Sequence, residues 1–360
     1  MTEPTVGSVR VAVVDDSAFI RRAVVRMLSD VPGISVVATG CNGREAVDLA
    51  RQLHPDVIVM DVNMPEMDGL SALERIMREA PTAVLVLSTV TSEGAEVTLR
   101  ALELGAVDFI DKTTAGTAMD IHELQAVLRD KVLAVAGVQP PPPRAASPPQ
   151  PRAERLVPAQ LASSATVELI AIGASTGGPR ALSRLLPNLP ADLPVPIVIA
   201  QHMPEGFTST LAQRLDNQSQ VAVREARDGD ALEPALALIA PGGKQMRVVR
   251  EDGRLVARVS GGAPGELHHP SVDLLFRSIA DAVGSGTVAV VLTGMGADGA
   301  AGLRQVRDGG GRTVAESQDT AVIYGMPRAA GEWADEILPL DRIAPALVAF
   351  CMSGAAEGGG

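Results

Sequence analysis

The sequence predicts an α/β protein built from two doubly wound domains, each with a mostly parallel sheet. Short apolar runs alternate with helical patterns in both halves of the chain, and a proline-rich stretch separates the halves. A chain of 360 residues is long enough for two domains that each bury a core. We therefore expect domains at residues 8–130 and 166–353, joined by a linker at residues 136–165.

The composition is that of a globular protein in a reducing compartment. Hydrophobic residues make up 46% of the chain and charged residues 21%. A net charge of −12 and only 2% aromatic residues oppose nucleic acid as a partner. No apolar run reaches about 18 residues and no signal peptide pattern opens the chain, so we expect no membrane insertion. The two cysteines, Cys41 and Cys351, fit a cytoplasmic protein.

The first half has the alternation of a small doubly wound domain. Apolar runs occur at residues 9–14, 34–38, 57–60, 83–87 and 106–110, with helical patterns at 18–28, 46–53 and 70–77. In such sheets, ligands bind at the carboxyl ends of the strands.

Polar side chains follow several of these apolar runs. They are Asp15, Asp16, Asp61, Ser88, Thr89 and Lys112. Each aspartate alone is typical of a helix cap. Together, however, carboxylates that meet at one sheet edge repel one another unless a cation joins them, and oxygen ligands favour Mg²⁺. A lysine and a hydroxyl beside that ion would complete a seat for a phosphoryl group.

Four motifs carry a resemblance: VAVVDDS, DVIVMDVNMPEMDGL, VLVLST and GAVDFIDK. This part of the chain resembles the receiver domain of bacterial two-component response regulators. The resemblance implies that Asp61 is the phosphoacceptor and that Asp15, Asp16 and Asp61 bind Mg²⁺.

The same resemblance assigns the remaining polar groups and one aromatic residue. It implies that Lys112 contacts the phosphoryl group and that Phe109 is the aromatic that reorients on phosphorylation. Ser88 would be the switch hydroxyl, with Thr89 as the alternative, because the alignment there is uncertain by one residue.

The predicted linker carries eight prolines between Pro140 and Pro158 and has no apolar period. Such a composition is typical of a semi-stiff spacer. A proline-rich docking motif for another protein is the alternative.

The second half opens on an apolar run at residues 167–171, a small-residue turn and a helix that begins near Pro179. Ser175 lies in the turn. One interpretation is a serine nucleophile, because Gly173-Ala-Ser175-Thr-Gly177 fits the pattern G-x-S-x-G. A glycine-rich phosphate cradle is the second, although the Walker spacing fails, and a merely structural turn is the third.

The alternation then resumes through the rest of the second half. Strands are expected at 197–200, 236–240 and 288–292, helices at 207–215, 272–283 and 300–306, and an antiparallel pair at 247–250 and 255–259.

Three reactive side chains lie at or beyond the ends of different strands: Ser175, His202 and Asp298. A serine nucleophile needs a base, and the base needs a carboxylate that sets its tautomer, so the set predicts a catalytic triad. The alternatives are a structural strand-end histidine and an aspartate that caps the following helix. His268 and His269 are rival bases that precede a helix, and we expect them to contact substrate rather than to act as the base.

A tetrahedral intermediate also needs N–H donors. The turn Thr293-Gly-Met295-Gly is flanked by glycine just before Asp298, and we expect the backbone N–H of Met295 to serve as an oxyanion donor. A plain core residue is the alternative for Met295.

Further motifs carry a second resemblance: GASTGGP, IAQHM, IAPGG, HHPSVDLLFRS and LTGMGADGAAGL. Together with the receiver-like half, they make nearly the whole chain similar to the chemotaxis protein-glutamate methylesterases of the CheB family. The resemblance implies Ser175 as nucleophile, His202 as base, Asp298 as orienting carboxylate and Met295 as oxyanion donor, with no cofactor for the esterase reaction.

The family implies a function as well. Its members hydrolyse glutamate γ-methyl esters on methyl-accepting chemotaxis receptors, many also deamidate receptor glutamines, and a CheA-type histidine kinase is the phosphodonor. One alternative is a response regulator whose second domain binds a partner without chemistry. The other is a methylesterase in a chemosensory pathway that does not control motility.

Overall fold

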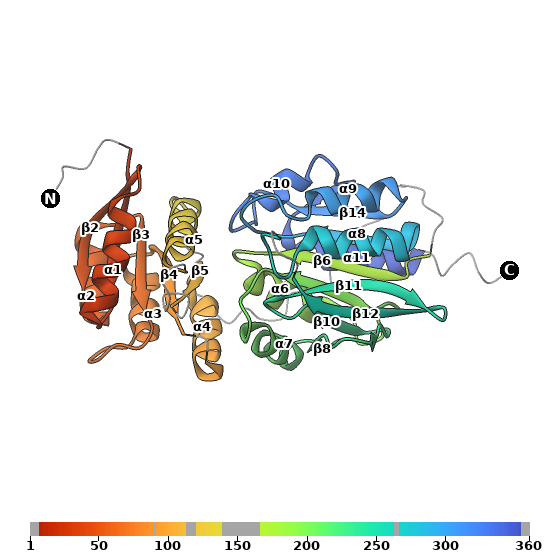
Figure 1. Ribbon diagram of the computed structural model, residues 1–360, viewed down its shortest axis with the longest axis horizontal. Helices are drawn as coiled ribbons and strands as arrows, with labels where there is room; N and C mark the ends of the chain where they lie inside the picture. The colour runs from red at the N-terminus through yellow and green to blue at the C-terminus, as the bar shows by residue number, and fades with distance from the viewer. Residues whose placement is uncertain (1–6, 90, 113–119, 139–165, 263–265, 354–360) are drawn as a thin grey trace. The chain divides into compact units, whose positions relative to one another are not determined.

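The computed structural model describes residues 7–89, 91–112, 120–138, 166–262 and 266–353 (Figure 1). The chain divides into two compact units, Met1–Gln150 and Pro151–Gly360. Most of the predicted linker, residues 139–165, lies outside the described residues.

The first unit is a parallel sheet between two layers of helices. Its strands are β1 (Val9–Val14), β2 (Ile34–Gly40), β3 (Val57–Asp61), β4 (Ala83–Ser88) and β5 (Asp108–Asp111), in the order β2-β1-β3-β4-β5. Its helices are α1 (Ala18–Ser29), α2 (Gly43–Leu53), α3 (Gly69–Glu79), α4 (Ser92–Leu104) and α5 (Asp120–Val135). Helices α1 and α5 contact each other, and α3 contacts both α2 and α4. This is the expected doubly wound architecture.

The predicted apolar runs are strands in the structure. A parallel strand that is covered by helices on both faces is buried along its length and is therefore apolar at each position. Every residue of β3 and of β4 is buried. The run at 106–110 begins earlier than β5, since Ala106 and Val107 are buried in the loop before the strand. The alternation predicts a helix after each strand, but no residue range was predicted for α4 and α5.

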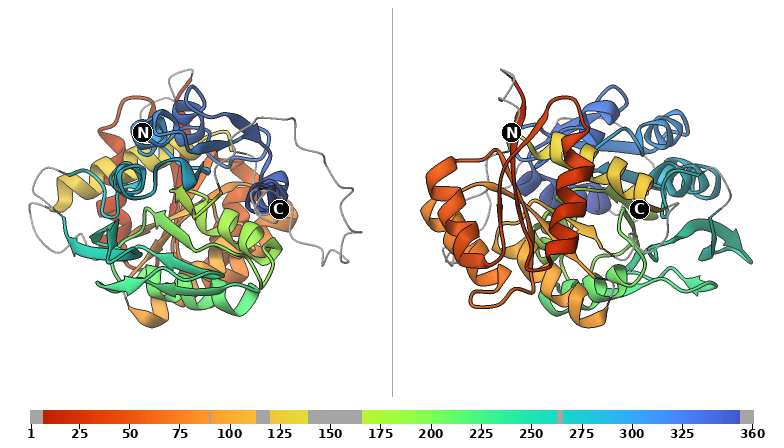
Figure 2. Two further views of the ribbon diagram at one scale, coloured as in Figure 1. Left: turned by 90° about the vertical axis from the view of Figure 1, so that its right-hand side faces the viewer. Right: turned by 60° about the vertical axis from the view of Figure 1, so that its left-hand side comes forward.

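The second unit is a larger sheet of the same kind. Its parallel strands are β6 (Leu169–Ala174), β7 (Ile197–Gln201), β8 (Ala222–Glu225), β10 (Leu236–Ile239), β13 (Thr287–Val291), β14 (Arg312–Glu316) and β15 (Glu336–Leu338). Its α-helices are α6 (Gly178–Leu185), α7 (Phe207–Gln218), α8 (Val272–Ala282), α9 (Ala300–Asp308), α10 (Met326–Ala330) and α11 (Leu340–Ser353). Helix α9 contacts α8 and α10, whereas α6 contacts α7 and α11 (Figure 2).

The expected antiparallel pair is present and longer than predicted. It consists of β11 (Lys244–Glu251) and β12 (Arg254–Gly261), and the short β9 (Asp230–Ala231) adds a third strand. The two-residue turn between β11 and β12 has Asp252 and Gly253 at φ 47° and 79°, as a type I′ hairpin requires.

The strand order creates a crevice in the second unit. Strand β6 lies between β7 and β13, so the chain leaves β6 to one side and later returns to its other side. Such a switch point opens a ligand crevice at the carboxyl ends of the strands. Ser175 follows β6, His202 follows β7, and the loop with Met295 and Asp298 follows β13.

No helix in the described parts of the chain combines the length and the apolar character needed to span a bilayer.

Candidate functional site

Ser175 lies in a tight turn between β6 and α6. Its backbone N–H donates to Thr293 O at 3.0 Å, which anchors the turn to the segment after β13. Gly177 takes the left-handed conformation at φ 80°, and a Cβ atom there would lie 2.7 Å from Val322 Cβ, so only glycine fits. The Ser175 hydroxyl is partly exposed and makes no hydrogen bond within the described part of the chain.

His202 is held beside this turn. Its backbone N–H donates to Ala174 O at 2.9 Å, next to the serine. Its Nε2 lies 2.7 Å from Asp298 Oδ2, and its ring is largely buried. Its Nδ1 makes no hydrogen bond within the described residues and is the ring nitrogen available to another group. No hydrogen bond joins Ser175 Oγ to the ring among the described residues, as is common for a catalytic serine without substrate.

Gln201 connects the Ser175 turn to His202, and the sequence interpretation missed it. The buried side-chain Nε2 donates to Ser175 O at 2.9 Å and to His202 O at 3.0 Å. A signal was present, because a long polar amide ends an otherwise apolar strand directly before the histidine.

The Asp298 carboxylate is bound from several sides. Besides His202, it accepts hydrogen bonds from Val272 N at 2.7 Å, Asp273 N at 2.9 Å and Ser271 Oγ at 3.1 Å. Burial raises the pKa of Asp298, but the bonds from His202 and from the backbone outweigh it and lower the pKa to about 2. Asp298 therefore caps α8, not the helix that follows it.

This lowered pKa predicts a pH-dependent stability. The ionised Asp298 stabilises the folded state above the ordinary pKa of 3.8, and that contribution is lost as the pH falls toward 2. We expect the difference in unfolding free energy between wild type and Asp298→Asn to shrink by about 2 kcal/mol from about pH 5 to about pH 2. Fluorescence of Trp333, the single tryptophan, follows unfolding of the second unit.

Ser209→Ala is the control, because it changes no titrating group. A difference between wild type and Asp298→Asn that stays constant from about pH 5 to about pH 3 would contradict the assignment.

His268 reaches the site although it follows no strand. Its ring stacks on His202 with centroids 4.2 Å apart and planes inclined by 15°. Burial, followed by the neighbouring His202, lowers the pKa of His268. Possible ligand atoms of His202, His268 and Asp298 lie within 4.8 Å of one another. Stacked imidazoles, however, direct their lone pairs side by side rather than at one ion, so this geometry does not suit a metal. His269 contacts Glu266 instead, at 3.5 Å.

The turn around Met295 lies against the serine. A Cβ atom added at Gly294 would lie only 2.8 Å from Ser175 Cβ. The Met295 N–H has no hydrogen-bond partner in the described residues, and the residue is half-buried rather than part of the core. A free N–H next to a serine hydroxyl suits a developing oxyanion.

The acidic residues of the first unit gather at the ends of β1 and β3. Carboxylate oxygens of Asp15, Asp16 and Asp61 lie within 4.8 Å of one another. Lys112 Nζ is 2.8 Å from Asp15 Oδ2 and 2.7 Å from Asp61 Oδ2. Burial raises the pKa of Asp15 despite the opposing effect of Lys112. Three clustered carboxylates offer the oxygen donors that Mg²⁺ prefers.

Both candidate switch hydroxyls line a small cavity together with Asp61 and Lys112. Ser88 is buried and accepts a hydrogen bond from Thr98 Oγ1 at 2.5 Å, whereas Thr89 is exposed. The side chain of Phe109 is buried. The choice between Ser88 and Thr89 and the movement of Phe109 stay predictions.

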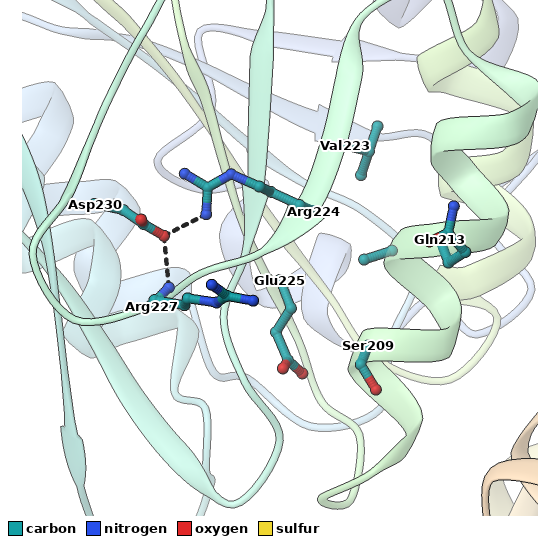
Figure 3. Close-up of a pocket in the computed structure, with 8 residues that line it drawn as sticks. Ser209, Gln213, Val223, Arg224, Glu225, Arg227 and Asp230 are labelled. Carbon is teal, nitrogen blue, oxygen red and sulfur yellow. Dashed lines mark hydrogen bonds and ion pairs between the residues drawn. The ribbon is translucent and has the colours of Figure 1, made fainter.

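A separate cavity of about 480 Å³ lies between α7 and β8 and includes none of the triad residues (Figure 3). Arg224 and Asp230 form an ion pair within the cavity, and Asp230 also accepts from the Arg227 backbone N–H. Glu225 accepts from Thr208 Oγ1 at 2.6 Å. Two arginines and two carboxylates give it no preference for an ion of either sign.

Comparison with known proteins identifies the family of each unit. Residues 170–347 match the family model of the CheB methylesterase, and residues 11–123 match that of the response regulator receiver domain. A protein-glutamate methylesterase/protein-glutamine glutaminase 1 from Oleidesulfovibrio alaskensis is 44% identical, over 94% of this chain and 98% of its own length. A protein-glutamate methylesterase/protein-glutamine glutaminase from Geobacillus kaustophilus is 43% identical, over 95% and 98%.

A solved structure gives the same result for the second unit. The CheB methylesterase catalytic domain of Thermotoga maritima is 40% identical and superposes with a TM-score of 0.50, over 51% of this chain and 99% of its own. Both relatives align over 98% of their own length. In this chain the match to the receiver model precedes the match to the methylesterase model. The chain belongs to the CheB methylesterase family, with a receiver domain ahead of the methylesterase domain.

Proposed function

We propose that this methylesterase removes methyl groups from glutamate γ-methyl esters of methyl-accepting chemotaxis receptors in the cytoplasm, by means of Ser175, His202 and Asp298. The observation that carries the proposal is the 2.7 Å contact of His202 Nε2 with a buried carboxylate, beside a serine hydroxyl without a partner. A base with a fixed tautomer next to a free hydroxyl is what activates a serine.

The chemistry follows from these groups. Ser175 Oγ attacks the ester carbonyl carbon while His202 Nδ1 takes its proton, and the Met295 N–H donates to the resulting oxyanion. His202 returns the proton to the methoxy group, methanol leaves, and a γ-glutamyl ester of Ser175 remains. Water then attacks that ester with His202 again as base, which releases glutamate and restores the serine.

The same steps hydrolyse a glutamine side chain, with ammonia as the leaving group in place of methanol. Relatives of this chain carry both activities in their names. We therefore propose deamidation of receptor glutamines as the second reaction, and we assign no cofactor to either reaction.

Release of methanol from a methylated receptor fragment tests the proposal with the full chain. A serine-directed phosphonate distinguishes it from a partner-binding domain without chemistry, because the proposal requires one adduct, at Ser175. If methanol forms no faster than from the receptor fragment without the protein, and no adduct forms, the second domain is a partner-binding domain without chemistry.

We propose further that Asp61 accepts a phosphoryl group from a CheA-type histidine kinase. Asp15, Asp16 and Asp61 would hold Mg²⁺, which supplies positive charge to the phosphoryl oxygens when bound. Lys112 balances the added charge, and Ser88 or Thr89 bonds the phosphoryl group as Phe109 reorients.

Phosphorylation is expected to raise the esterase rate. Acetyl phosphate with Mg²⁺ should speed methanol release by the full chain by roughly 5- to 150-fold, the usual range of coupling between sites. Asp61→Ala should abolish this response, whereas Asp48→Ala, which removes an exposed carboxylate on α2, should retain it.

A fragment that begins near residue 160 separates two kinds of control. If the receiver restrains the enzyme at rest, the fragment is faster than the unphosphorylated full chain. If it is no faster, the receiver acts as an activator or a targeting device. An equal response of Asp61→Ala and wild type would refute control through Asp61.

A further inference from the structure

Helices α8 and α9 of the methylesterase domain begin side by side, and the N–H groups at the start of each are bonded by an aspartate from the other segment. The first N–H groups of a helix have no partner within the helix. At the start of α8, Asp298 fills this role by accepting from Val272 N and Asp273 N at 2.7 and 2.9 Å. Asp298 itself belongs to the loop that leads into α9.

The start of α9 is satisfied in the reverse direction. Asp273, in the first turn of α8, accepts with Oδ1 from Gly299 N at 3.0 Å and from Gly302 N at 2.6 Å. The N-cap residue of α9 is Gly299, which has no side chain to supply this bond. The two helices therefore cap each other through Asp273 and Asp298.

Close packing fixes this arrangement. A Cβ atom at Gly299, which has φ 95°, would lie 2.7 Å from Val272 Cγ1. A Cβ atom at Gly302 would lie 2.6 Å from Phe276 Cβ. The helix starts thus approach so closely that only glycine fits on the α9 side, and the bonds to Asp273 set how α9 begins.

We infer that Asp273 is a positioning residue for the esterase reaction, an inference that rests on the proposed triad. Asp273 holds the N–H of Gly299, the residue directly after Asp298, and so fixes the main chain from which the Asp298 carboxylate reaches His202 Nε2. Asp273 has no hydrogen bond to Ser175 or His202 among the described residues. It acts through the placement of Asp298 alone.

A different role for Asp273 would be purely electrostatic. An acidic residue in a first turn stabilises its own helix, and Asp273 Oδ2 lies 3.7 Å from Arg277 Nη2, one turn further along α8. The positioning role uses Oδ1, which accepts from Gly299 N and Gly302 N, whereas the contact with Arg277 uses Oδ2. Asparagine keeps the Oδ1 acceptor but loses the charge, whereas glutamate keeps the charge but moves the acceptor outward by one methylene group.

Methanol release by the full chain is measured for Asp273→Ala, Asp273→Asn and Asp273→Glu. Asp273→Ala is expected to lower kcat by about 10- to 100-fold, because misplacement of a catalytic group by about 1 Å has an effect of that size. KM stays unchanged, since no substrate contact is lost. Asp273→Asn should recover most of kcat, and Asp273→Glu should not.

Asp216→Ala is the matched control. It removes another aspartate of the same domain that accepts a backbone N–H, from Val223 at 2.8 Å, away from the triad. It should lower the melting temperature without lowering kcat. Ser175→Ala in the same assay tests the triad itself, so failure of the proposed function is seen separately.

Wild-type kcat in folded Asp273→Ala would overturn the inference, as would an asparagine variant no faster than the alanine variant. If Asp273→Ala does not fold, the other two variants decide. A higher kcat for Asp273→Asn than for Asp273→Glu supports positioning, and an equal or higher kcat for Asp273→Glu overturns it.

Discussion

Replacing Ser175 with alanine is expected to lower methanol release by at least ~10³-fold, because a triad member usually contributes that much to the rate. The substitution removes only the Oγ atom, which has no hydrogen bond within the described residues. The bonds that shape the turn, from Ser175 N to Thr293 O and from Gln201 Nε2 to Ser175 O, are made by the backbone of residue 175 and remain. The fold should therefore stay intact while the nucleophile is lost.

Initial rates of methanol release from a methylated receptor fragment measure this effect, with thermal unfolding as the test of the fold. Ser209→Ala removes a hydroxyl from the exposed side of α7 and should keep the wild-type rate. If Ser175→Ala retains more than about a tenth of the activity, Ser175 is not the nucleophile, since its hydroxyl would then contribute less than a triad member does.

The sheets were predictable because a buried parallel strand is a continuous apolar run, which can be seen in the sequence without knowing which strands it pairs with. Some strands without a continuous apolar run were missed. Strand β15 has no fully buried residue, and β8 has only Val223 buried, so neither forms an apolar run. No range was predicted for helix α4, although Thr91 caps it and Gly105 ends it.

The placement of the candidate site residues was predictable where chemistry and strand ends coincide, as for Ser175 and His202. The supporting residues were not, because their roles depend on contacts between distant parts of the chain. Asp273 looks like an ordinary first-turn acid until α9, 26 residues away at Gly299, is placed beside it. His268 precedes a helix in the sequence, and only the fold stacks its ring on His202.

Asp298→Asn is expected to slow methanol release by ~10²- to 10⁴-fold, with the fold retained. Asparagine has nearly the shape of aspartate but offers one acceptor oxygen where the carboxylate offers two. In Asp298, Oδ1 accepts from Ser271 Oγ and Asp273 N, while Oδ2 accepts from His202 Nε2 and Val272 N. One of these two sets must therefore face the amide NH₂ group of the variant.

The amide has two orientations, and both are unfavourable. With its oxygen toward His202, the NH₂ group faces the Asp273 N–H, and an unsatisfied buried donor costs about 1–3 kcal/mol. With its NH₂ group toward His202, Nε2 must accept, so the ring proton moves to Nδ1 and the imidazole can no longer take the serine proton. In the first orientation, the loss of negative charge also leaves the imidazolium without its counter-ion.

Asp216→Asn provides the comparison for this variant, because Asp216 accepts from Val223 N through one oxygen only, which asparagine retains. Its rate should equal that of wild type. Because the carboxylate bonds both His202 and the start of α8, the variant should also lose some thermal stability. The assignment of Asp298 therefore requires that kcat falls by ~10²-fold or more in a variant that is still folded. An Asp298→Asn enzyme with an unchanged rate would leave Asp298 with its role at the start of α8 alone and would require another group to orient His202.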